Sequence, residues 1–418
     1  MLQLRFYLLT LSLILFYRPY IFSQDDKVAL SMRKAESEFQ NGNWEEALKI
    51  YQRLATDRPD SVPAQVGMAS SLVKLKDYPT AIIAFHRALK FSPNLSRVQG
   101  ALADTYNKNK QPDEATKWYQ KAIKSFYGKA PLPWYINLGI IEAKQGNLDQ
   151  ARHYYTVAAQ LYPKSVPAYQ NLGTVLLRQN RLDEADACFY TALELNPQFD
   201  PALFGRGEVA KRKGNLIKAQ RLYVAAIQLN SGDSAYRYVY AQALLQSGKI
   251  TKGKQELQKA RRLKAEYHLQ HAHHLAQQKD WQETLRYLKL AIDADPTLVE
   301  ATQDLAYLQT QSDDLAAAES TLSLGLLNKP DWASGYWQRG KVKEQISDFV
   351  GAESDFRQAI KLSPNTAPPK ISLAQLLAKT GKNLDQALEL AQTAIEIDPK
   401  PEFQKVIKMI RRKIESEK

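Results

Sequence analysis

The sequence predicts an all-α solenoid built from about eleven helix-turn-helix units and closed by a C-terminal capping helix. Prolines recur with a step of 34 residues, from Pro163 to Pro197, from Pro296 to Pro330, and from Pro330 to Pro364. Between these prolines, apolar residues recur at helical spacing in two segments that meet at a polar corner. One such hairpin leaves an apolar face uncovered, so it needs similar hairpins to stack upon.

The stretch 166–199 shows the pattern of one unit. Its first predicted helix has a proline in the first turn, where the missing N–H is tolerated. Its second helix opens with Asp183 and Glu184, which favour the positive end of the helix dipole. We expect Gly173 and Ala185 at the crossing of the two helices, because only small residues allow a close approach. A bulky residue at either position should therefore destabilise the array.

Units of this kind are expected from near Val28 to residue 400, within a repeat region that spans 24–400. The seventh unit is shorter than the others, with Gly253 at its small position. The predicted units are 28–61, 62–95, 96–131, 132–165, 166–199, 200–233, 234–264, 265–298, 299–332, 333–366 and 367–400.

At its small, aromatic and proline positions the chain resembles the tetratricopeptide repeat family. The resemblance implies a right-handed superhelical solenoid whose first helices line a concave surface for an extended peptide or a helix of a partner. It therefore implies a protein–protein interaction scaffold and no catalytic activity. The matching residues include Leu138, Gly139, Ala151, Tyr155, Ala158 and Pro163 in one unit, Leu172, Gly173, Ala185, Phe189, Ala192 and Pro197 in the next, and Gly340, Ala352, Phe356, Ala359 and Pro364 further on.

The groove residues follow from this resemblance, position by position. Asn137 and Asn171 are equivalent in adjacent units, and an asparagine amide can hold a ligand backbone through its donor and acceptor. Ile136, Ile140 and Gly205 replace parts of the family's clamp for a terminal carboxylate, so that clamp is not expected. Phe204, Lys211 and Tyr238 are further candidates for the same surface.

Cations occupy one repeat position in five successive units, and we call this set the basic column. Two interpretations are open: stabilisation of helix C-termini by cations, or a surface that attracts acidic segments of a partner. The members of the basic column are Lys74, Lys108, Lys144, Arg178 and Arg212.

The two ends of the chain differ from the repeats. Residues 1–23 combine Arg5 with a short apolar run, which predicts a secretory signal peptide and an exported, periplasmic or extracellular protein. The alternative is an uncleaved segment that anchors the chain to the inner membrane. Residues 401–418 form a basic amphipathic segment that should cap the last repeat. Its cations could also contact an anionic membrane or an acidic partner.

The composition restricts the chemistry. The net charge of +13 is compatible with simple solubility or with acidic partners, among which nucleic acid is not favoured. The single cysteine excludes an intramolecular disulfide and a cysteine-based zinc site. We therefore expect other proteins as partners. The alternative function is a carrier or assembly factor for acidic polysaccharide or lipid in envelope biogenesis.

No motif predicts an enzyme or a cofactor site. The stretch 335–342 imitates a phosphate-binding loop, but its last position is Val342, where magnesium binding needs serine or threonine. A histidine cluster in the eighth unit allows a metal site by spacing alone, although polar packing within the array is the simpler interpretation. Its members are His268, His271, His273 and His274.

Overall fold

The computed structural model describes residues 26–416, and the regular structure of this part of the chain is helical throughout. Its 22 helices form consecutive antiparallel hairpins followed by one C-terminal helix. The chain divides into two compact units, Met1–Leu222 and Tyr223–Lys418, and the division falls inside the helix Leu216–Leu229. The predicted all-α solenoid of about eleven hairpins with a C-terminal helix is confirmed.

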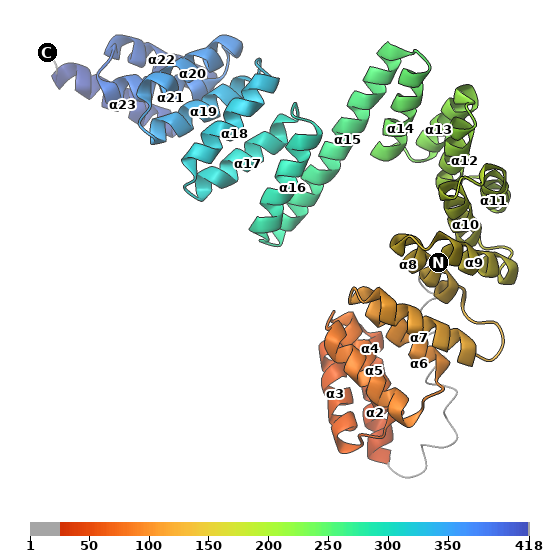
Figure 1. Cartoon of the computed structure of the whole chain (residues 1–418). Coiled ribbons are helices and arrows are strands. Elements are labelled where there is room, and N and C mark those ends of the chain that lie inside the picture. The colour runs from red at the N-terminus through yellow and green to blue at the C-terminus, as the bar shows by residue number, and fades with distance from the viewer. Residues whose placement is uncertain (1–25, 417–418) are drawn as a thin grey trace. The chain divides into compact units, whose positions relative to one another are not determined.

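The first unit is a stack of hairpins, seen in Figure 1 as successive helix pairs. Its helices are α2 (Asp26–Gln40), α3 (Trp44–Asp57), α4 (Val62–Lys74), α5 (Tyr78–Phe91), α6 (Ser96–Lys108), α7 (Pro112–Ser125), α8 (Leu132–Gln145), α9 (Leu148–Leu161), α10 (Val166–Arg178), α11 (Leu182–Leu195), α12 (Asp200–Arg212) and the first part of α13 (Leu216–Leu229). The second helices from α3 to α11 pack against their own first helix and against the next one, as α11 does with α10 and α12. The first helices α8, α10 and α12 also contact one another in sequence.

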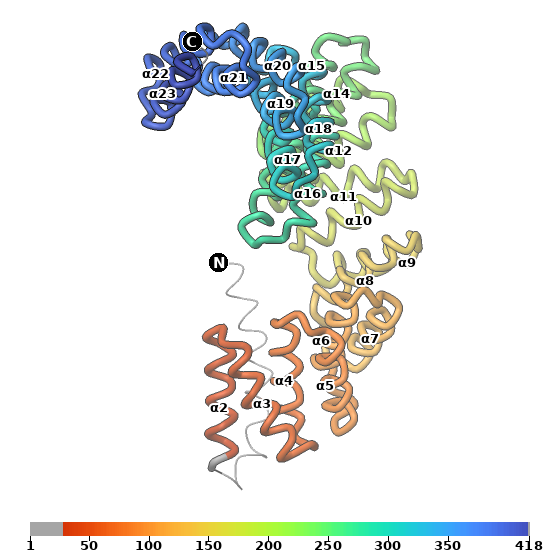
Figure 2. The backbone as a smooth tube through the Cα atoms, turned by 90° about the vertical axis from the view of Figure 1, so that its left-hand side faces the viewer, coloured from red at the N-terminus to blue at the C-terminus, as the bar shows by residue number. Residues whose placement is uncertain are grey.

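The second unit continues with the same kind of hairpin and ends in a single helix, as the backbone trace in Figure 2 shows. Its helices after α13 are α14 (Ser234–Gln246), α15 (Ile250–Gln277), α16 (Trp281–Ala294), α17 (Val299–Gln311), α18 (Leu315–Asn328), α19 (Ala333–Gln345), α20 (Phe349–Leu362), α21 (Ala367–Thr380), α22 (Leu384–Ile397) and α23 (Pro401–Ser416).

One helix departs from the pattern of separate hairpins. α15 runs for 28 residues without interruption, so the second helix of the seventh hairpin continues directly into the first helix of the eighth. The repeat boundary expected near residue 264 is therefore not a turn. Between Gly253 and Gln277 the sequence contains no proline or glycine that would end a helix.

In the hairpins of the first unit the core consists of small residues facing an aromatic ring, whereas Leu288 and Leu322 take the place of the ring in two hairpins of the second unit. Ala185 is fully buried and Phe189 is 1% exposed. The Phe189 ring lies so close to Gly173 that an added Cβ would be 2.7 Å from its Cε1 atom. Tyr155 covers Gly139 in the same way in the preceding hairpin. The close approach predicted from small residues is therefore made by an aromatic side chain as well as by the backbones.

The polar corner between the two helices of a hairpin needs a left-handed residue. Gly146 has a φ of 88°, and the equivalent Asn180 has a φ of 59°. Glycine and asparagine adopt this conformation more easily than other residues. The following N–H then reaches back to the first helix, as Arg181 N donates to Leu176 O.

α23 covers the last hairpin as predicted. Val406 and Ile410 are buried in the core formed with α21 and α22. Lys413 donates a hydrogen bond of 2.6 Å to Ala378 O, 35 residues earlier in the sequence. Arg178 makes the same contact with Ala143 O, also 35 residues away. α23 is thus placed as the first helix of a further repeat would be.

The predicted signal or anchor segment 1–23 lies outside the described residues. Among the described helices, none combines the length and apolar character that a membrane crossing requires.

Candidate functional site

The basic column lies on the first helices of the first unit. Its five cations are the last charged residues of α4, α6, α8, α10 and α12, and all five residues are exposed. The first helices α8, α10 and α12 contact one another in sequence, so Lys144, Arg178 and Arg212 lie on neighbouring helices. From the sequence, two interpretations of the basic column were open, a structural role and a binding role.

Two members of the basic column have a structural contact. Arg178 Nη1 donates to Ala143 O at 2.9 Å, and Arg212 Nη1 donates to Leu177 O. Each arginine thereby satisfies a carbonyl at the C-terminal end of the preceding first helix, where a cation is also favoured by the helix dipole. Lys74 Nζ lies 5.9 Å from the centre of the Trp44 ring. For Lys144, no ion pair or hydrogen bond of the side chain is found within residues 26–416.

Asn137 belongs to a polar network inside the first unit. Its Nδ2 donates to Asp104 Oδ1 at 3.1 Å and to the Tyr119 hydroxyl at 2.9 Å, and that hydroxyl donates to Asp104. Burial raises the pKa of Asp104, although the hydrogen bonds from Tyr119 and Asn137 and the charge of Lys108 act in the opposite direction. The amide donor of Asn137 is therefore engaged, and its binding role remains a prediction.

Asn171 occupies the equivalent repeat position on α10, but its amide is not engaged as that of Asn137 is. It is half-buried, and its amide makes no hydrogen bond with the part of the chain that the structure describes. The neighbouring Gln170 has a buried Oε1 that also lacks a partner among these residues. The half-buried amide of Asn171 is thus available to a ligand, whereas the Oε1 of Gln170 is shielded from solvent.

The remaining predicted residues are dispersed. Phe204 is half-buried on α12, and Lys211 Nζ lies 3.8 Å from Glu208 on the same helix. Tyr238 lies on α14 in the second unit and is 47% exposed. The structure brings Asn171, Arg178, Phe204 and Arg212 onto the neighbouring first helices α10 and α12. Tyr238 belongs to the second unit.

The histidine cluster does not converge on one point. His271 packs edge-on to Tyr287 with ring centres 4.3 Å apart, while His273 Nε2 pairs with Asp304 at 2.7 Å. Within residues 26–416, no group of three potential ligands could hold a metal ion. Burial lowers the pKa of His268, with Lys264 and His271 adding to the effect.

The stretch 335–342 is helical rather than a phosphate-binding loop. It lies inside α19, and an added Cβ at Gly340 would lie 2.6 Å from the Phe356 ring. Gly335 is covered by Trp332 in a comparable way. Both glycines therefore serve helix packing.

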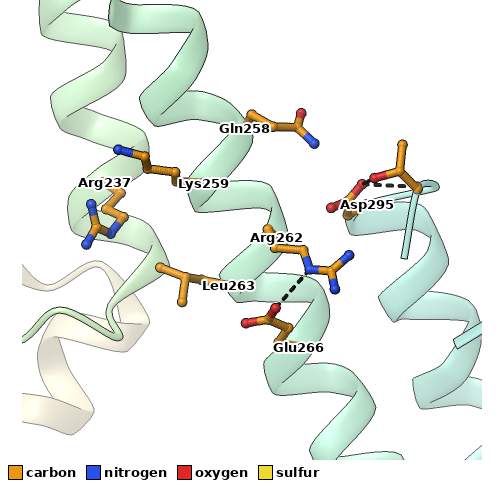
Figure 3. Close-up of a pocket in the computed structure, with 8 residues that line it drawn as sticks. Arg237, Gln258, Lys259, Arg262, Leu263, Glu266 and Asp295 are labelled. Carbon is orange, nitrogen blue, oxygen red and sulfur yellow. Dashed lines mark hydrogen bonds and ion pairs between the residues drawn. The ribbon is translucent and has the colours of Figure 1, made fainter. Parts of the chain in front are cut away.

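Sequence reasoning missed a pocket in the second unit, which we call the α15 pocket. It has a volume of about 420 Å³ and is bordered by α14, α15 and the turn between α16 and α17 (Figure 3). The uninterrupted α15 supplies most of its wall, including Lys259, Arg262 and Glu266. The absence of a proline in this stretch was the signal that could have indicated an irregular repeat here.

Stacked helical hairpins of one length, with exposed polar residues on their first helices, define a helical repeat protein of the solenoid class. Three family models described as tetratricopeptide repeat match residues 94–164, residues 32–96, and residues 142–205, 275–339 and 347–410. Together these matches cover more than half of the sequence, and the chain belongs to the tetratricopeptide repeat family. Repeats of this fold are typically non-catalytic. The unmatched stretch 206–274 includes most of α15.

Several solved structures are similar to parts of this chain at low sequence identity. The C-terminal part of a TPR repeat-containing protein from Cytophaga hutchinsonii is 20% identical, with 66% of this chain and 99% of that chain covered and a TM-score of 0.45. YrrB, described as a TPR protein with an unusual peptide-binding site, is 19% identical over 48% of this chain and 98% of its own, with a TM-score of 0.41. PilW, a type IV pilus biogenesis factor, is 20% identical over 50% of this chain and 94% of its own, with a TM-score of 0.41. Among curated proteins, none matches this chain.

Proposed function

We propose that the chain is a non-catalytic interaction scaffold whose first unit binds acidic, extended segments of partner proteins along its first helices. The observation that carries this proposal is the basic column, which keeps five exposed cations at one repeat position of α4, α6, α8, α10 and α12. Membership of the tetratricopeptide repeat family supports a protein-interaction role in general.

The spacing of the basic column suits an extended chain. Packed helices lie about 10 Å apart, and an extended strand advances about 3.3 Å per residue. Acidic residues at every third position of a partner segment would therefore meet successive cations. Exposed cations of this kind steer association and set its salt dependence.

Asn171 would add specificity to this attraction. Its amide lies on α10, the first helix between α8 and α12, and it makes no hydrogen bond with the described residues. An amide offers both a donor and an acceptor to the N–H and C=O of an extended partner. The cations would then attract the segment, and the amide would hold its backbone.

The proposal is tested by capture of partners from detergent-solubilised cell envelope on the immobilised chain, at low and high salt, with identification by mass spectrometry. A variant that combines Lys108→Gln, Lys144→Gln and Asn171→Ala should lose a defined protein that the unchanged chain retains. The matched control carries Lys90→Gln and Lys124→Gln, two exposed lysines on the second helices α5 and α7. Equal retention by both variants would contradict binding along the first helices.

A second candidate function is a carrier or assembly factor for acidic polysaccharide or lipid. The observation that favours it is the outer face of α23, where four exposed cations have no ion partner within residues 26–416. These residues are Lys405, Lys408, Arg411 and Arg412. Retention of only anionic glycan or lipid in the capture experiment, abolished by salt, would favour this function over the scaffold.

We also propose that the chain acts after export, in the periplasm or outside the cell, or anchored to the inner membrane if residues 1–23 are retained. The support is the short apolar run that follows Arg5. N-terminal sequencing of the protein from fractionated cells distinguishes the two forms. Recovery of the full chain in the cytoplasm would contradict both.

A further inference from the structure

The α15 pocket belongs to the second unit, whereas the basic column belongs to the first, and the pocket depends on the irregular seventh repeat. Arg237 reaches it from α14, Arg262 and Glu266 from α15, and Asp295 from the turn after α16 (Figure 3). Its volume of about 420 Å³ is far larger than the roughly 30 Å³ that one water molecule occupies. The pocket can therefore accept a group of the size of one or two amino-acid residues.

The charges around the α15 pocket largely cancel one another. Glu256 accepts from Arg237 at 3.1 Å and from Lys259 at 2.8 Å, and Arg262 Nε pairs with Glu266 at 2.8 Å. Burial acts to raise the pKa of Glu256, but the hydrogen bonds from Lys259 and Arg237 outweigh it, so the pKa is lowered. A pocket whose cations and carboxylates are already paired favours neither a free anion nor a free cation.

Two side chains in the α15 pocket nevertheless keep polar atoms that make no hydrogen bond within residues 26–416. Asp295 is 2% exposed; its Oδ1 accepts from the backbone N and the hydroxyl of Thr297, whereas its buried Oδ2 has no hydrogen bond with residues 26–416. A buried acceptor without a partner is costly. On the other side, only the Nε of Arg262 donates a hydrogen bond to the described residues, which leaves its two terminal amino groups unused. Its Nη2 is 3.9 Å from Glu300, too far for a hydrogen bond.

An unused acceptor and an unused donor in the lining of one pocket match one chemical group in particular. In an extended peptide, the N–H and C=O of a single residue point to the same side, as they do in a hydrogen-bonded pair of an antiparallel sheet. We propose that the α15 pocket binds one extended residue of a partner protein, whose N–H donates to Asp295 Oδ2 and whose C=O accepts from the terminal amino groups of Arg262. The residue's apolar side chain packs against Leu263, which also lines the pocket.

This second peptide site follows from the fusion of two helices. In the other hairpins a turn separates each second helix from the next first helix, whereas here α15 continues through the place of that turn and carries Glu266 there, close behind Arg262 and Leu263. The site is independent of the basic column, so either can fail without the other. A partner bound at both would gain avidity from the two contacts.

The test uses N-acetyl-L-leucine N-methylamide, the smallest molecule with the N–H, C=O and side chain of one residue. It is titrated into the full chain with methyl-labelled leucines, and the Leu263 methyl signals are followed by NMR. Binding with a Kd on the order of 1 mM is expected for so small a ligand. Leu373, which is buried in the last hairpins, should show no change.

Three comparisons make the result specific. The analogue in which an ester oxygen replaces the leucine N–H should bind about tenfold more weakly, and so should the unmodified probe with the variant Asp295→Asn. The matched control is Asp398→Asn. Asp398 follows α22 with nearly the same backbone angles as Asp295 has after α16, but it lies outside the pocket. The proposal is overturned if Leu263 does not respond to the probe, if the ester binds equally well, or if acetate or methylamine shifts Leu263 as strongly as the probe.

Discussion

The ring of Phe189 packs directly against Gly205 of the next hairpin, where an added Cβ would lie 2.6 Å from the ring atom Cζ. Phe189 covers Gly173 of its own hairpin as well, so one aromatic side chain joins two repeats. The substitution Gly205→Ala should therefore lower the free energy of unfolding by about 1–3 kcal/mol through overpacking. This destabilisation should exceed the stabilisation of about 1 kcal/mol that results because alanine favours a helix more than glycine does.

Chemical denaturation of the unchanged chain and of the Gly205→Ala variant measures the difference in the free energy of unfolding. Gly232→Ala is the control, because a Cβ at Gly232 would meet no atom within 4 Å. The double change Gly205→Ala with Phe189→Leu should lose less stability than the sum of the single changes, since the smaller side chain relieves the clash. A Gly205→Ala variant as stable as the unchanged chain would show that the ring does not hold this position.

The arginines of the basic column should contribute to stability separately from any binding. Arg212→Gln removes the hydrogen bond to Leu177 O, and we expect a loss of about 1 kcal/mol in the free energy of unfolding. Lys144→Gln should change it by less than about 0.5 kcal/mol, because that exposed lysine forms no hydrogen bond or ion pair within residues 26–416. Denaturation curves of the two variants separate the structural role from the binding role. Equal losses would contradict this division.

Most of the fold could be predicted because each repeat position has a local packing role. Gly173, Ala185 and Phe189 form one contact within about 20 residues of sequence, so their spacing reveals the hairpin directly. The fused helix α15 could not be recognised from the apolar pattern, because the pattern continues with nearly the same period on both sides. Only the missing helix-ending residue between Gly253 and Gln277 indicated it.

The candidate site was harder to predict than the fold. Asn137 has the residue type and position of a ligand-binding amide, but Asp104 of the preceding repeat uses its donor. This hydrogen bond depends on Asp104, which lies 33 residues earlier and does not belong to the small, aromatic and proline positions of the repeat. The α15 pocket likewise combines Arg237, Arg262 and Asp295 from three segments, and no local motif records that they meet.

The Asp104 network should make stability depend on pH. The pKa of Asp104 is raised above its ordinary value of 3.8, so the folded chain favours the protonated carboxyl. The stabilising contribution is present below the ordinary value and is lost as the pH rises through the folded-state pKa. Asp104→Asn keeps an acceptor for Tyr119 and Asn137 without the charge. Thermal denaturation is measured from acidic to neutral pH. The unfolding temperature of the variant should rise relative to that of the unchanged chain as the pH increases, and a relative decrease would contradict the assignment.

The Cys188 thiol should react slowly in the folded protein. Burial, with a smaller effect of Glu184, raises its pKa to about 11 from an ordinary 9.0. The thiolate fraction near pH 8 is then about a hundredfold lower than in the unfolded chain. The rate of modification by iodoacetamide should rise at least that much in denaturant, with Cys188→Ser as the blank. Similar rates in both states would show that the hairpin of α10 and α11 opens readily.

The continuity of α15 can be tested with proline at two equivalent repeat positions. Proline stands at this position in several hairpins, for example Pro197 and Pro296, where it follows a helix end. Ser231 occupies it in the turn between α13 and α14, whereas Ala265 occupies it inside α15, where it is fully buried. Ser231→Pro should therefore be tolerated.

Ala265→Pro removes a helical hydrogen bond and clashes with the preceding turn, which costs about 3 kcal/mol or more. Circular dichroism should show lower helicity and a lower unfolding temperature for Ala265→Pro only. The same variant should also lose the response of Leu263 to the capped leucine, because the α15 pocket needs an uninterrupted helix. If both prolines are tolerated equally, α15 is two helices with a turn between them, and the pocket does not exist in solution.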